Sequence, residues 1–131
     1  MIYVDTSVAL AHLLAEDHRP AAAFWQHELV TSRLLEYELW TRLHARHLAR
    51  SHGDVARLLL ARFAWVELRP VVLERALQPF PVALRTLDAL HLASLSFLRE
   101  HGHDVALATY DARMKRVARA MGSPRATGLK C

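Results

Sequence analysis

The sequence predicts an α/β fold with a mainly parallel central sheet of about four to five strands, flanked by helices. Two short apolar runs, Ile2 to Val4 and Val105 to Thr109, have the composition of strands buried on both faces, as parallel strands are. Helical segments alternate with the strand-like runs, which favours right-handed βαβ units. No repeat, linker or low-complexity segment interrupts the 131 residues, so we expect one domain over residues 1–131.

Capping residues, prolines and apolar stripes set the boundaries of the expected elements in the first half of the chain. Asp5, Thr6 and Ser7 are candidate N-caps for the first helix, and Pro20 suits the first turn of the second. His52-Gly53-Asp54 is expected to end a long helix marked by a leucine stripe. We therefore expect a strand, two helices, a strand and two helices at residues 2–4, 8–16, 21–29, 29–32, 33–50 and 55–64.

Similar signals divide the second half of the chain. Pro79 and Pro81 mark an exposed loop, Thr86 is a candidate cap for the helix after it, and Gly102 ends that helix. The tail from Ser123 is expected to carry a last edge strand or to stay loose. We therefore expect a strand, two helices, a strand and a helix at residues 66–68, 71–77, 87–100, 105–109 and 112–121.

The composition narrows the classes of function. No stretch approaches the roughly 20 uncharged apolar residues of a membrane span, and the N-terminus lacks the features of a signal peptide, so we expect a cytoplasmic protein without membrane contact. The single cysteine, Cys131, excludes an intrachain disulfide and is expected as an exposed thiol. The nine histidines are scattered without a CxxC or HExxH pattern, so we expect no zinc site.

The net charge of +4 is carried almost entirely by arginine. Arginine binds phosphate with two parallel hydrogen bonds and stacks on bases, so this bias is compatible with a nucleic-acid partner. It is equally compatible with simple compositional bias or with an acidic protein partner. Charge alone does not choose between these interpretations.

Acidic residues in apolar or small neighbourhoods carry the functional prediction. Asp5 and Asp111 each end an apolar strand, and Asp88 lies in the first turn of a helix that is apolar nearly all round. Carboxylates rarely occupy such settings unless they are paired or bind a cation, and sites in open α/β sheets form at the carboxyl ends of strands. Structural roles remain open: a helix cap for Asp5 and Asp111, and an interaction with the helix dipole for Asp88.

The fourth acid is ambiguous from the pattern. Glu36 and Glu38 both flank the leucine stripe of the long helix, and periodicity does not choose between them. Glu38 has Arg42 four residues on, which fits an ordinary surface ion pair. His91, one turn after Asp88, is expected to lie in the core or to support a ligand rather than to be one.

The chain resembles a PIN domain, and more narrowly a VapC-type toxin ribonuclease, over nearly its whole length. The resemblance rests on the strand running into Asp5, on TSRLLEYEL, on LDALHLASL, and on LATYDARM with a glycine after the next helix. The family places a Ser or Thr six residues before its helical acid. Ser32 and Glu38 match this spacing, so the resemblance selects Glu38. The other family acids fall on Asp5, Asp88 and Asp111, and we note that Tyr110, Glu36 and a poorly marked last strand depart from the family pattern.

The resemblance implies an endoribonuclease, the toxin of a VapBC-type toxin–antitoxin module, which cuts structured RNA such as transfer or ribosomal RNA. Carboxylates without a Cys or His cage suit Mg²⁺, or Mn²⁺, and such an ion would bind the scissile phosphate and activate water. Without metal, the four carboxylates would repel one another. We expect Asp5 and Asp88 as direct ligands, with Glu38 and Asp111 acting through water or a second ion. The hydroxyls of Thr6, Ser7 and Thr109 are candidates to orient the substrate phosphate, as substrate-orienting groups, or the outer shell of the cation.

By the same resemblance, the expected partners are the RNA substrate, a VapB-type antitoxin and a second copy of the chain in a homodimer. Trp25, Trp40 and Leu43 are candidates to line an antitoxin groove, although ordinary core is the simpler interpretation of each. A non-catalytic PIN-like RNA-binding or scaffold domain, or a PIN nuclease of RNA processing outside toxin–antitoxin systems, are the alternatives. A receiver domain would require a lysine that ends a buried strand, and neither Lys115 nor Lys130 does so.

Overall fold

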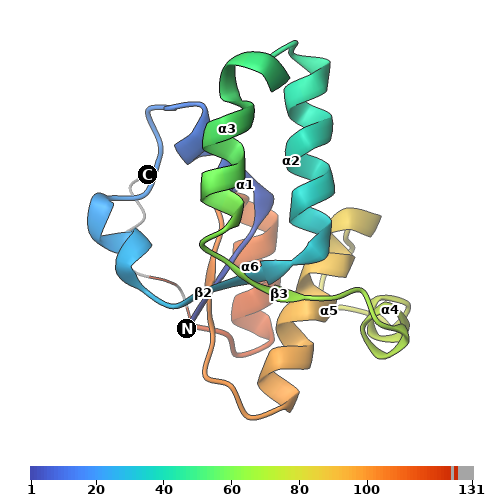
Figure 1. The fold of residues 1–131 in the computed structure, drawn as a ribbon. Helices are drawn as coiled ribbons and strands as arrows, with labels where there is room; N and C mark the ends of the chain where they lie inside the picture. The colour runs from blue at the N-terminus through green and yellow to red at the C-terminus, as the bar shows by residue number, and fades with distance from the viewer. Residues whose placement is uncertain (125, 127–131) are drawn as a thin grey trace.

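Four parallel strands form the central sheet of the computed structural model, which describes residues 1–124 and residue 126 (Figure 1). The strand order is β3-β2-β1-β4, with β1 paired to β2 on one side and to β4 on the other. The α/β class and the parallel sheet predicted from the sequence are therefore confirmed. The strands are β1 (Ile2–Val4), β2 (Leu29–Ser32), β3 (Ala64–Val66) and β4 (Ala106–Ala108).

Helices cover both faces of this sheet, and the alternation of side chains along β1 divides the core in two. Ile2 and Val4 pack in an apolar cluster with α1, α2 and α3, whereas Tyr3 packs on the opposite side with α5 and α6 (Figure 1). The helices are α1 (Thr6–Leu13), the 3₁₀ helix η1 (Ala22–Gln26), α2 (Arg33–Ala45), α3 (Ala49–Leu60), α4 (Pro70–Ala76), α5 (Thr86–Glu100) and α6 (Ala112–Ala120).

The predicted long helix over residues 33–50 is wrong, because the chain turns after Ala45. His47 adopts a left-handed backbone conformation with φ of 57°, and the Leu48 amide donates to the Leu43 carbonyl at 2.8 Å. This is the hydrogen bond that closes a helix C-terminus, here without the usual glycine. Gly53, expected to break a helix, instead lies inside α3, where an added Cβ would be 3.6 Å from the Trp40 ring.

Three other predicted features of the helices are corrected. The helix expected over residues 21–29 is only the short 3₁₀ helix η1. The first helix begins at Thr6 rather than at residue 8, because Asp5 itself is the N-cap and accepts from the Val8 amide. Thr86 does not cap α5; it is the first residue of that helix, and the N-cap position before it makes no side-chain hydrogen bond.

The strands at residues 2–4 and 29–32 lie where they were predicted, and β4 lies within the predicted range 105–109. β3 begins two positions earlier than the predicted start at residue 66. Beyond α6, the Leu107 amide donates to the Pro124 carbonyl and the Ala126 amide donates to the Leu107 carbonyl, so the chain runs beside β4. The remaining tail predictions, including the one for Cys131, fall on residues 125 and 127–131, outside the described residues.

The three residues considered for an antitoxin groove belong to, or pack against, the apolar cluster formed with α1, α2 and α3. Leu43 is fully buried in it, and Trp25 and Trp40 are partly buried and pack against it. No helix in the described part of the chain is long and apolar enough to cross a membrane.

We expect His47→Gly to raise the free energy of unfolding by about 0.5–1 kcal/mol, because glycine adopts the left-handed conformation without the steric cost that a Cβ atom imposes. Denaturation in urea measures the change. Ala45→Gly, two residues earlier in right-handed helix, is the matched control and should lower the stability. A loss of stability in His47→Gly would contradict the prediction.

Candidate active site

The four acids selected on the sequence lie around one cavity of about 390 Å³ at the carboxyl end of the sheet. Asp5 directly follows β1, and Asp111 follows β4, the parallel neighbour of β1. Glu38 comes from the second turn of α2, and Asp88 comes from the first turn of α5. Residues far apart in the chain meet here because parallel strands end at the same edge of the sheet.

Asp5 is the most firmly held of these acids. Its carboxylate caps α1 by accepting from the Val8 amide at 3.3 Å, and it accepts from the Ser7 hydroxyl at 2.6 Å and from the Thr109 hydroxyl. The residue is 5% exposed. Burial raises the pKa of Asp5, while the hydrogen bonds from Ser7 and Thr109 oppose that rise by favouring the ionised form.

Glu38 is held from the side of the core. Its Oε1 atom accepts a hydrogen bond from the Thr6 hydroxyl at 2.7 Å and lies 2.6 Å from His91 Nε2. The other ring nitrogen of His91, Nδ1, lies 2.8 Å from the hydroxyl of the fully buried Tyr3. The side chain of Glu38 is 21% exposed, and both Glu38 and His91 line the cavity.

Asp88 and Asp111 form the more open side of the cavity. Burial raises the pKa of the half-buried Asp88, and the negative charges of Asp111 and Glu38 raise it further. Asp111 is exposed and caps α6 by accepting from the Met114 amide at 2.9 Å. Asp111 therefore caps α6 and lines the cavity at the same time.

The structure separates the two glutamates that the pattern left tied. Glu36 lies 3.5 Å from Arg33, which also pairs with Glu67 at 2.6 Å, and Glu36 does not line the acidic cavity. Glu38 lines it together with Arg42. The alternative of a surface ion pair between Glu38 and Arg42 is not realised, because the carboxylate oxygens and guanidinium nitrogens of these two described residues do not come within 4.0 Å of each other.

Two residues of the cavity wall were missed on the sequence. Glu16 and His18 line the cavity, although their surroundings had the polar character of a solvated loop. They reach it because the chain turns at Ala15, whose φ is 50°, after the end of α1. Nothing in the sequence pattern marks that turn, since glycine is the residue expected there.

A second, wider opening shares Asp88 and Asp111 with this cavity and is rimmed by cations. It measures about 620 Å³ and is lined by Glu38, Asp88 and Asp111 together with Arg42, Arg85, Arg113 and Arg116. The acids thus lie within a basic surface, an arrangement that lets a polyanion approach.

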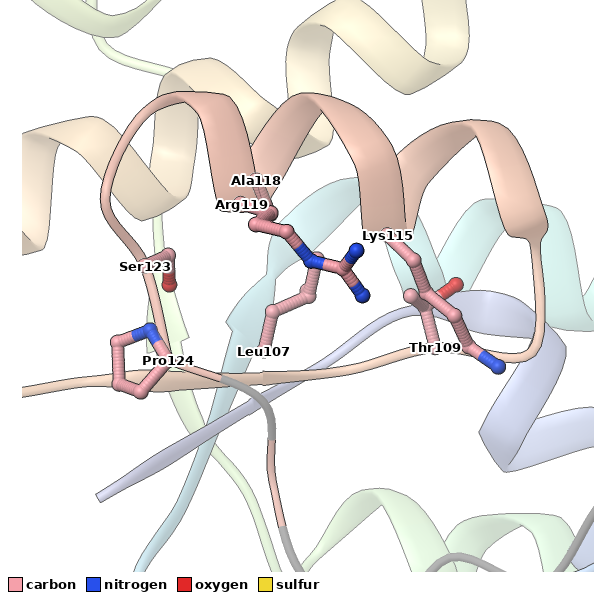
Figure 2. A pocket seen from close by; sticks show the side chains of 7 residues that line it. All are labelled: Leu107, Thr109, Lys115, Ala118, Arg119, Ser123 and Pro124. Atoms are coloured by element: carbon pink, nitrogen blue, oxygen red, sulfur yellow. The ribbon is translucent and has the colours of Figure 1, made fainter.

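A separate cavity lies between α6, β4 and the segment after α6 (Figure 2). Lys115 and Arg119 extend over it, and none of its described lining residues carries a carboxylate. Its lining is otherwise apolar or hydroxyl-bearing, from Leu107, Thr109, Ala118, Ser123 and Pro124. The described lining of this cavity offers no carboxylate ligand for a cation, and Lys115 and Arg119 add two positive charges to the surface of α6.

The donor chemistry of the acidic cavity fits a hard cation, although its present geometry is open. Five carboxylates line this cavity, from the four acids selected on the sequence and from Glu16, and none of the described lining residues is a cysteine. Carboxylate oxygens are the ligands that Mg²⁺ prefers. Within residues 1–124 and 126, no three or more His, Cys, Asp or Glu side chains are grouped closely enough to hold a metal ion as they stand. The raised pKa of Asp88, caused by burial and by the neighbouring acids, is what a cation would reverse.

Comparison with known proteins identifies the family. Residues 2–120 match the model of the PIN domain. The chain belongs to the PIN domain family. Ribonuclease VapC35 of Mycobacterium tuberculosis (strain CDC 1551 / Oshkosh) is 33% identical over 126 residues, covering 92% of each chain. Ribonuclease VapC46 of Mycobacterium tuberculosis (strain ATCC 25618 / H37Rv) is 32% identical over 125 residues, again covering 92% of each.

A solved structure agrees with this PIN assignment at the level of the fold. VapC20 of Mycobacterium tuberculosis, a sarcin–ricin loop cleaving toxin, has a TM-score of 0.67 and 23% identity, covering 88% of this chain and 94% of that one. The resemblance to PIN domains and VapC proteins seen in the sequence is therefore confirmed.

We expect Asp88→Asn to raise the free energy of unfolding of the metal-free protein at pH 7, by at most about 1 kcal/mol because the group is only half-buried. The folded-state pKa of Asp88 lies above the ordinary 3.8. The folded protein therefore retains this proton to higher pH, and ionisation lowers stability as pH rises through that interval.

Urea denaturation in EDTA at pH 7 and at pH 3.5 measures the effect, which should vanish at the lower pH. Asp104→Asn, an exposed acid outside the cavity, is the control and should change little. A less stable Asp88→Asn protein at pH 7 would show that the favourable helix-dipole interaction outweighs repulsion in the cavity.

Proposed function

We propose that this protein is a Mg²⁺-dependent endoribonuclease and the toxin of a VapBC-type toxin–antitoxin module, acting on structured RNA such as transfer or ribosomal RNA. The observation that carries the proposal is the meeting of the four acids selected on the sequence in one cavity, next to an opening that four arginines line. Relatives named VapC ribonucleases, matched over nearly the whole chain, support the same activity.

Asp5 and Asp88 are the residues that would hold the cation directly, with Glu38 and Asp111 contributing through water or to a second ion. When bound, Mg²⁺, or Mn²⁺ in its place, supplies electrostatic stabilisation of the charge that develops on the phosphate and lowers the pKa of water. Asp5 suits this role because its position is fixed by three hydrogen-bond donors. Asp88 suits it because a positive charge relieves its unfavourable surroundings.

The hydroxyl groups beside the acids support the carboxylates. Ser7 and Thr109 donate to Asp5, and Thr6 donates to Glu38. Of the two roles expected for the three hydroxyls, these contacts favour orientation of the groups around the cation over orientation of the substrate phosphate. A hydroxyl that already donates to a carboxylate has only acceptor capacity left, which does not suit a phosphate oxygen.

The arginines around the wider opening are proposed to bind the RNA backbone. Arg42, Arg85, Arg113 and Arg116 share that opening with three of the acids, so a phosphate held there lies beside the reaction site. Guanidinium groups bind phosphate through paired hydrogen bonds and contribute most of the salt-dependent affinity for nucleic acid. Lys115 and Arg119 extend the positive surface along α6 (Figure 2).

The partners follow from the same relationship. We propose that a VapB-type antitoxin restrains the nuclease, that the chain forms a homodimer, and that it acts in the cytoplasm. The similarity to VapC ribonucleases supports the proposal of an antitoxin partner and of RNA as the substrate. A non-catalytic RNA-binding domain would need the basic surface but not the acids, so mutation of the acids separates the two functions.

We expect Asp5→Asn and Asp88→Asn each to lower Mg²⁺-dependent RNA cleavage by about 10²-fold or more, since each removes a negative ligand for the cation. Cleavage of a labelled structured RNA, with and without EDTA, measures the loss. Asp104→Asn is the matched control, and circular dichroism checks folding. If both folded variants cut RNA at the wild-type rate, the hypothesis that this cavity is the nuclease active site is wrong.

Glu38→Gln should reduce cleavage far more than Glu36→Gln, by about tenfold or more against little change. Both substitutions remove one negative charge from α2, but only Glu38 lies in the cavity, while Glu36 pairs with Arg33. The same cleavage assay compares them. The opposite ranking would assign the functional acid of this helix to position 36.

A further inference from the structure

We propose that His91 is a positioning residue that fixes the Glu38 carboxylate for cation binding, with Tyr3 setting the orientation of the His91 ring. The inference rests on the proposed function, because it takes Glu38 as one of the groups that serve the cation. A continuous chain joins the three side chains: Tyr3 Oη is 2.8 Å from His91 Nδ1, and His91 Nε2 is 2.6 Å from Glu38 Oε1.

The direction of the hydrogen bonds follows from the acceptor at the end of this chain. An ionised carboxylate can only accept hydrogen bonds, so His91 Nε2 carries a hydrogen atom and donates a hydrogen bond to Glu38. In a neutral ring, Nδ1 is then the acceptor, and the Tyr3 hydroxyl donates to it. A tyrosine hydroxyl has an ordinary pKa of about 10, so it remains a donor throughout the physiological range. Tyr3 thereby selects the ring tautomer that can reach Glu38.

The two oxygens of Glu38 are treated differently by the protein. Oε1 receives the Thr6 hydroxyl at 2.7 Å and the His91 ring at 2.6 Å. Among the described residues, none forms a hydrogen bond to Oε2. One oxygen is therefore anchored on the core side, and the other remains for a ligand in the cavity that Glu38 lines.

This polar chain passes through a region where apolar packing is otherwise the rule. Tyr3 is 0% exposed and His91 is 3% exposed, and Leu92 and Ala93 beside His91 belong to the apolar core. Burying polar groups is unfavourable unless every member is satisfied, so a purely structural solution would use apolar side chains. The series of hydrogen bonds from Tyr3 through His91 ends at Glu38, which lines the cavity, so we infer that its role is to hold this carboxylate in place.

Loss of such a supporting hydrogen bond typically weakens metal affinity by about 10–100-fold. We expect His91→Leu to weaken Mn²⁺ binding to the full-length protein by about tenfold or more. Tyr3→Phe should give a smaller loss in the same direction, because it removes only the hydroxyl that orients the ring. His91→Gln should retain much of the affinity, since an amide N–H can still donate to Glu38.

Isothermal titration with Mn²⁺, in the absence of RNA, measures these affinities independently of cleavage. Each variant is also made in the Glu38→Gln background, giving a double-mutant cycle. If His91 acts through Glu38, His91→Leu has no further effect once Glu38 has been replaced. Far-UV circular dichroism checks folding, and Tyr3→Phe, which removes a single oxygen atom, keeps the test available if His91→Leu does not fold.

The outcomes separate this inference from the proposed function. If Glu38→Gln itself leaves Mn²⁺ binding unchanged, the role proposed for Glu38 fails, and the inference fails with it. If Glu38→Gln weakens binding but His91→Leu does not, or if the two losses simply add, only the positioning role of His91 is overturned. Unchanged binding in Tyr3→Phe, beside a loss in His91→Leu, would remove Tyr3 from the proposal.

Discussion

The buried carboxylate of Asp5, at the junction of β1, α1 and β4, is the constraint on which the arrangement of the site depends. It caps α1, and it accepts from Thr109 at the end of the neighbouring strand. The Asp5 amide also donates to the Ala108 carbonyl at 3.1 Å, and the Ser7 hydroxyl accepts from the Tyr110 amide at 3.0 Å. These hydrogen bonds join the segment before Asp111 to the end of β1, and they thereby hold Asp5 and Asp111 on the same side of the cavity.

This arrangement sets stability against function. Burial disfavours the charge on Asp5, and burial together with neighbouring acids disfavours the charge on Asp88. A fold selected only for stability would replace such groups by neutral ones, because an uncompensated charge in a partly buried site is unfavourable. The hydroxyls of Ser7 and Thr109 offset this cost at Asp5, whereas no hydroxyl among the described residues donates a hydrogen bond to Asp88. The unrelieved part of the cost is the physical argument for a cation.

The sequence predicted what depends on local apolar pattern and failed where tertiary contacts decide. The strand at Ile2–Val4 and the cap at Asp111 follow from runs of apolar residues and from a capping side chain. The turn at His47 could not be predicted, since left-handed conformations are expected at glycine, and Gly53 nearby lies inside a helix against Trp40. Propensity was overridden there by the packing of α2 on α3.

The same distinction applies within the site. Periodicity could not separate Glu36 from Glu38, because both flank the inward stripe of α2, and the deciding factor is which partners surround each one. Glu36 meets Arg33, a partly exposed cation on the same helix, whereas Glu38 meets Thr6 and His91, which come from other helices. A sequence pattern contains no information on such contacts between distant segments. The supporting groups of a site are therefore harder to predict than its acids, although they determine how firmly those acids are held.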